Sequence, residues 1–157
     1  RKIRLGHGSG RIRIVVTSKK RIGKRIRRYV RRRRPVSKAS QDHYLEHKEA
    51  TRKLVSERLP QHIETYRALG IEFKAPGKIF IKNTRTRWGS CSSKGNLNFS
   101  YRLSLLPLHL ADYIIIHELC HLREFNHSSR FWDLVALMVP EYDAWREELK
   151  KHSLRRV

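Results

Sequence analysis

The residues with the clearest chemical potential are the five of His117-Glu-Leu-Cys-His121. Residues four apart lie on one face of a helix, so the two imidazoles could bind a single metal ion. Glu118 is placed beside them to accept a proton from a water molecule on that ion. A third histidine, His127, follows where the helix should end. Three protein ligands with an open fourth position are typical of catalytic zinc, whereas structural zinc takes four protein ligands.

The same residues also have a plain structural interpretation. His117 and His121 could be hydrogen-bonded histidines at the edge of a helix, with Glu118 as a solvated charge and His127 as a surface residue of a loop. Four aromatic residues follow at helical spacing and are most simply interpreted as core residues: Phe131, Trp132, Tyr142 and Trp145.

The elements that must position these residues can be predicted from the pattern of apolar residues. The apolar run 111–116 should bury a helix that extends from Pro107 to about residue 123. Two further helices are predicted over 130–138 and 141–151. Before them, a helix is expected from about residue 37 to Gly70, kinked or divided at Pro60. Strands are predicted over 11–17, 20–30, 71–73, 78–83 and 96–100, with 84–95 as a loop. This order predicts an α+β fold.

Charge is concentrated at the start of the chain. The 157 residues carry 36 Lys or Arg against 14 Asp or Glu, a formal net charge of +22. Residues 1–41 contain 17 of the basic residues and no acidic one. A segment of this kind attracts acidic partners such as nucleic acid, and Arg31, Arg32, Arg33 and Arg34 are the candidate contacts. We therefore expect basic strands over 1–36, within the same structural unit as a core over 37–157.

Several classes of protein are excluded by composition. Two cysteines cannot form a disulfide scaffold, and the apolar runs are too short to cross a membrane. No leader peptide is recognisable, so we expect a cytoplasmic protein that does not bind membranes. The chain begins at Arg1 rather than Met, which leaves open whether the N-terminus is complete. The oligomeric state is open as well.

Four stretches together resemble a known family. They are residues 85–99, the pair Leu106-Pro107, His117-Glu-Leu-Cys-His121, and Asn126-His-Ser-Ser-Arg-Phe-Trp132. They are similar to the YgjP-like zinc metallopeptidases, which are related to the SprT-like peptidases. The resemblance implies a small zincin-like domain that hydrolyses peptide or protein substrates. It also implies that His117, His121 and His127 bind one Zn²⁺ and that Glu118 is the catalytic acid and base.

Substrate contacts can be proposed around this motif. Strand 96–100 alternates in polarity just before the metal helix, so an extended peptide could pair with its backbone, near Asn96 and Asn98. Arg87 or Arg130 could stabilise the negative charge that develops on the substrate oxygen.

Two other functions fit the same sequence. One is a nucleic-acid-binding protein whose metal site is structural or vestigial. The other is a metal-dependent nucleotide phosphohydrolase, because an activated water beside basic residues would also suit a phosphate. The peptidase and nucleic-acid hypotheses are compatible. As the resemblance to SprT-like peptidases suggests, residues 1–41 could tether a peptidase near nucleic acid. Ligand type alone does not distinguish zinc from other divalent metals.

Overall fold

The chain consists of two compact units, Arg1–Ser37 and Lys38–Val157. The computed structural model describes residues 14–15, 29–30, 37–84 and 86–152. In the first unit, β1 (Ile14–Val15) pairs antiparallel with β2 (Tyr29–Val30). These two pairs of residues fall within the predicted strands 11–17 and 20–30. The remainder of both predicted strands and the arginines at 31–34 lie outside the described residues. The proposed grouping of 1–36 with the core stays a prediction.

The second unit begins with one long helix, α1 (Lys38–Ala68). Its buried side chains are spaced three or four residues apart and form one stripe: Thr51, Val55, Leu59, His62 and Tyr66. Pro60 is exposed and the helix continues through it, so the predicted division at this residue is wrong. Because Pro60 lies on the solvent side, water can satisfy the carbonyl that loses its helical partner.

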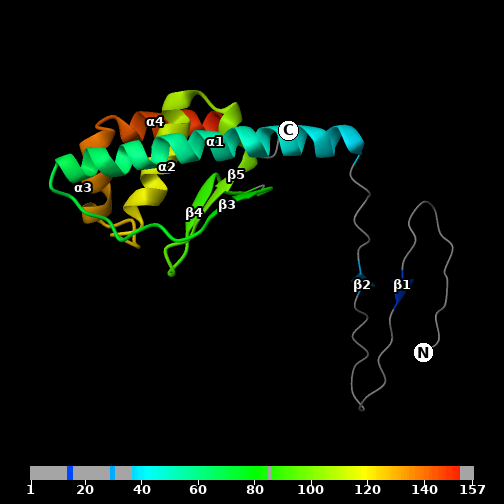
Figure 1. The fold of residues 1–157 in the computed structure, drawn as a ribbon, viewed down its shortest axis with the longest axis horizontal. Helices are drawn as coiled ribbons and strands as arrows, with labels where there is room; N and C mark the ends of the chain where they lie inside the picture. Colours follow the sequence, from blue (N-terminus) through cyan, green and yellow to red (C-terminus); the bar gives the residue numbers. More distant parts are fainter. Residues whose placement is uncertain (1–13, 16–28, 31–36, 85, 153–157) are drawn as a thin grey trace, which may run out of the picture. The chain divides into compact units, whose positions relative to one another are not determined.

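The sheet of this unit has the order β3-β5-β4 (Figure 1). β3 (Ile79–Lys82) runs parallel to the central strand β5 (Leu97–Ser100), and β4 (Gly89–Cys91) runs antiparallel to it. Strand β4 lies inside residues 84–95, which were predicted to be a loop. Gly-Ser-Cys has no strand preference of its own, and pairing with β5 determines its conformation.

The predicted strand at 71–73 is absent, and these residues pack on the end of α1. The Ile71 amide donates to the carbonyl of Tyr66, and the Phe73 ring lies 4.9 Å from the Tyr66 ring in an edge-on contact. The chain here covers apolar surface without a neighbouring strand, so it forms no sheet.

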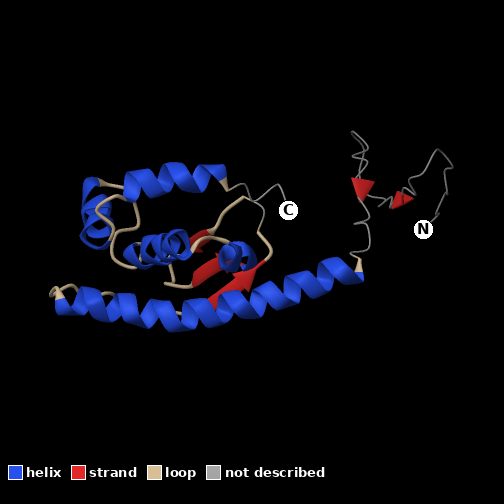
Figure 2. Ribbon diagram, turned by 90° about the horizontal axis from the view of Figure 1, so that it is seen from above, coloured by secondary structure: helices blue, strands red, loops and turns tan. Residues whose placement is uncertain are grey.

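The remaining helices complete the unit together with the sheet and α1. A 3₁₀ turn, η1 (Tyr101–Leu105), leads into α2 (Leu108–Cys120), which is followed by α3 (Ser129–Met138) and α4 (Tyr142–Lys151). Figure 2 shows α1 along one side of this unit and α4 along the other, with α2 and the sheet between them. This architecture confirms the predicted α+β fold. No described helix has both the length and the apolar character needed to cross a bilayer.

Helix α2 is the centre of this unit, with contacts to α1, α3, α4 and β4. Ten of its thirteen residues are buried, on all of its faces. Asp112 is the charged exception in its first half, and it accepts hydrogen bonds from Arg58 and His62 of α1. The helix ends at Cys120, a few residues before the predicted end at 123, with His121 as its cap.

Candidate metal centre

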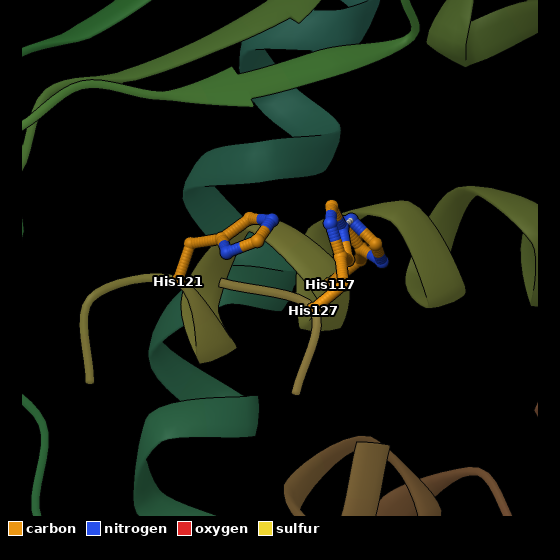
Figure 3. Close-up of side chains that lie close together, drawn as sticks. All are labelled: His117, His121 and His127. Atoms are coloured by element: carbon orange, nitrogen blue, oxygen red, sulfur yellow. Dashed lines mark hydrogen bonds between the residues drawn. The ribbon is translucent and has the colours of Figure 1, made fainter. Parts of the chain in front are cut away.

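Three histidines converge at the end of α2. His117 lies in the last turn of the helix, His121 caps it, and His127 lies in the loop that leads to α3. One ligand atom from each lies within 4.8 Å of the other two, and Nε2 of His127 is 3.0 Å from Nε2 of His117 (Figure 3). Nitrogens this close need a shared proton or a cation between them. The donor set therefore fits a metal ion that prefers imidazole, such as zinc.

The environment of the histidines favours the neutral imidazole that binds metal. His121 Nδ1 lies 3.0 Å from the carbonyl of Glu124, which fixes Nδ1 as the donor and leaves the Nε2 lone pair free to coordinate. Burial lowers the pKa of His117 to about 3, with smaller contributions from the charges of His121, His127 and Arg146. Burial also lowers the pKa of His121. These two histidines would need no deprotonation at neutral pH to bind a metal ion.

Glu118 is buried between α2 and strand β4. Only 5% of its surface is exposed, and burial raises its pKa to about 8, against the opposing charge of Arg87. Its Oε2 has no hydrogen-bond partner among the described residues. A buried carboxyl group without a partner and with a pKa near neutrality is suited to accept and return a proton.

The space for Glu118 depends on Gly89. A Cβ atom at position 89 would lie 2.5 Å from Oε1, 2.6 Å from Cγ and 2.8 Å from Cδ of Glu118. Only a glycine lets the β4 backbone approach the carboxylate this closely. Sequence reasoning missed this residue, because the approach is visible only once β4 is placed against α2.

Aromatic rings from the start of α3 pack against the histidines of this cluster. Phe131 stacks on His121 with ring centroids 4.5 Å apart, and Trp132 stacks on His127 at 5.6 Å. Phe131 is fully buried, as a core residue should be, and Trp132 is partly buried against the core. The prediction that these residues belong to the core omitted their contact with His121 and His127.

The other predicted site residues have different surroundings. Arg87 is exposed in the loop before β4, and its charge acts on Glu118. Arg130 is exposed in the first turn of α3. The Asn96 side chain accepts the Lys78 amide at 2.8 Å, and the Asn98 side chain donates to the Ser90 carbonyl at 3.2 Å. Both amides thus support the sheet, and their contact with substrate stays a prediction.

The prediction that a peptide pairs with strand 96–100 is wrong, because β5 is paired on both sides. The edge of the sheet near Glu118 is β4. The Trp88 carbonyl accepts from the Ser100 amide of β5, and the Ser92 amide donates to the carbonyl of Asn96, the residue before β5. The main-chain groups of the alternate residues Gly89 and Cys91 therefore point away from β5.

Comparison with known proteins gives a match to a family model and matches to two chains of solved structures, one of which is described below. The family model described as "YgjP-like, metallopeptidase domain" matches residues 1–152. The crystal structure of the metallopeptidase zymogen of Pyrococcus abyssi abylysin is 19% identical, with a TM-score of 0.47, over 69% of this chain and 93% of that one. No curated protein matches the chain.

Proposed function

The chain belongs to the YgjP-like metallopeptidase family, and we propose that it hydrolyses peptide bonds with one Zn²⁺ held by His117, His121 and His127. The observation that supports this most directly is the convergence of the three imidazoles beside the buried Glu118. When bound, zinc would supply Lewis acidity, which activates a water molecule and polarises the scissile carbonyl.

Glu118 is the proposed acid and base. Its carboxylate takes the proton from the attacking water and then delivers it to the leaving amine, so that one group serves both steps. Burial suits this role, because a carboxylate with a raised pKa is a stronger base than an exposed one and takes the proton of the water more readily. Arg87 acts on the same carboxylate and is our candidate for stabilising the developing oxyanion.

We place the substrate along the free edge of β4. An extended peptide would bond to the main-chain groups of Gly89 and Cys91, next to Glu118. Recognition through the backbone makes few demands on substrate side chains. The site would therefore accept many peptide sequences.

The test is the variant Glu118→Gln. It should bind zinc with the affinity of the parent chain and lose casein hydrolysis, because the amide cannot accept the proton. The matched control is Glu57→Gln, since Glu57 is an exposed residue of α1, and this variant should keep full activity. A chelator should abolish the activity of both the parent and this control. Undiminished hydrolysis by Glu118→Gln would refute the assignment.

The basic N-terminal segment supports a second, separate proposal. Its 17 basic residues attract an acidic partner, and we propose nucleic acid, with 31–34 among the contacts. Replacing the four arginines with serine should weaken DNA or RNA binding and reduce its dependence on salt. Casein hydrolysis should stay unchanged, since the proposed catalytic groups belong to the other unit of the chain. Equal binding by parent and variant would exclude these contacts.

A further inference from the structure

His127 is held differently from the other two ligands. His117 belongs to the buried helix α2, and His121 has a hydrogen bond at Nδ1. His127 is exposed in a loop, and its only polar contact with the described residues is the one between its Nε2 and His117. Its orientation must come from another kind of contact.

Two aromatic rings supply that contact. Trp132 lies nearly parallel to the His127 imidazole, with an interplanar angle of 27° and centroids 5.6 Å apart. Phe131 meets the same imidazole edge-on at 4.8 Å. Together they restrict both the plane and the position of the ring.

Trp132 is itself supported from α4. Tyr142 stacks on the indole with centroids 4.9 Å apart and an interplanar angle of 15°. The Arg146 guanidinium lies 5.4 Å from the centroid of the indole. The rings of His127, Trp132 and Tyr142 thus form a stacked series that connects the exposed ligand to a helix outside the metal site.

We infer that Trp132 is a positioning residue for the metal site, which holds the His127 imidazole so that its Nε2 faces His117. This inference rests on the proposed metal site and deepens it. Trp132 touches neither zinc nor substrate in this role. It acts through His127, as a hydrogen-bonding partner acts through the ligand that it orients.

The expected effect is a loss of metal affinity. Removing an outer-shell partner of a metal ligand typically weakens binding about 10- to 100-fold. Trp132→Ala should show a loss in this range, whereas Trp132→Phe keeps an aromatic ring and should lose less. Trp145→Ala is the matched control, because Trp145 is also partly buried but packs on His109. It should leave the zinc dissociation constant unchanged.

A double-mutant cycle separates positioning from general destabilisation. Zinc dissociation constants would be measured by chelator competition on the full chain for the parent, Trp132→Ala, His127→Ala and the double variant. If Trp132 acts through His127, the tryptophan substitution should cause no further loss when His127 is already alanine. The melting temperatures of the metal-free chains show whether each variant is folded. Trp132→Phe provides the comparison if Trp132→Ala does not fold.

The outcomes distinguish this inference from the proposed function. A parent chain that binds no zinc would overturn both. Normal zinc binding by the parent, with unchanged affinity in both Trp132 variants, would overturn the inference alone. The same follows if the losses at 127 and 132 add in full in the double variant.

Discussion

Substituting Gly89 with alanine should separate zinc binding from catalysis. The added Cβ would lie 2.5 Å from Oε1 of Glu118, whereas ordinary van der Waals contact begins near 3.4 Å. The backbone at Gly89 has no positive φ, so alanine fits its backbone conformation, and the three atoms nearest to the added Cβ all belong to Glu118. Because the contact involves Cγ and Cδ as well as Oε1, the whole carboxylate must move.

The required movement sets the size of the effect. Relieving the contact requires a displacement of about 1 Å, and a misplacement of that size costs about 10²-fold in rate. This lies within the 10²- to 10⁴-fold that a general base typically contributes. We therefore expect kcat to fall about 10²-fold. Zinc affinity should stay within about twofold of the parent value, because Glu118 is not a ligand.

The assay is peptide hydrolysis at saturating zinc, with the dissociation constant of zinc measured on the same protein. The control is Gly70→Ala. Gly70 has a φ of 76° and nothing within 4 Å of its Cβ position, so alanine there costs stability through the backbone alone. It should keep the parent kcat. A Gly89→Ala protein with full zinc occupancy and unchanged kcat would refute the role assigned to Glu118.

Three further predictions concern protonation. Burial raises the pKa of Glu118 to about 8, so between the ordinary pKa of a carboxyl group and pH 8 the folded chain holds a proton that the unfolded chain releases. The metal-free fold therefore loses stability as the pH rises through this range. Metal-free Glu118→Gln should therefore melt above the parent at pH 8, by a margin that shrinks toward pH 5; a constant margin would contradict this. Asp112 accepts hydrogen bonds from Arg58 and His62, and these bonds lower its pKa although burial alone would raise it. The ionised Asp112 therefore stabilises the fold above about pH 4, and this stabilisation is lost as the pH falls further. Asp112→Asn should cost about 2 kcal/mol in urea unfolding at pH 7, less than for a fully buried pair, because Arg58 is partly exposed; an equal loss at pH 3 would count against the ion pair. Finally, the lowered pKa values of His117 and His121 imply that zinc binding at pH 6 releases fewer protons than three ordinary imidazoles would. Calorimetry of Glu118→Gln in two buffers should detect this, because that variant has no carboxyl proton at position 118 to release, and a release of about two protons or more would contradict it.

The parts of the fold that could be predicted from sequence are those with local causes. The apolar run in α2 and the spacing of His117 and His121 place both imidazoles on one face, because helical periodicity alone determines it. The buried stripe of α1 follows from the same periodicity.

The parts that could not be predicted depend on pairing between distant segments. Nothing in Gly-Ser-Cys indicates strand β4, which forms because β5 pairs with it. The central place of β5, and with it the free edge beside Glu118, depends on the order of the sheet. The packing of Trp132 on His127 could have been predicted from the sequence. Helix α3 begins two residues after His127, so its first turns must lie near that histidine.

The position of α2 at the centre of the core also bears on how the metal can leave. Amides of a helix buried on every side exchange with solvent only when most of the fold opens, whereas loop amides exchange through local opening. His117 and His121 thus lie in or next to the helix whose amides exchange slowly, whereas His127 lies in the loop. Loss of zinc from the proposed site would then begin with opening of the loop that carries His127, while α2 stays folded. Stabilising the core would raise the melting temperature of the protein and leave the rate of zinc release nearly unchanged.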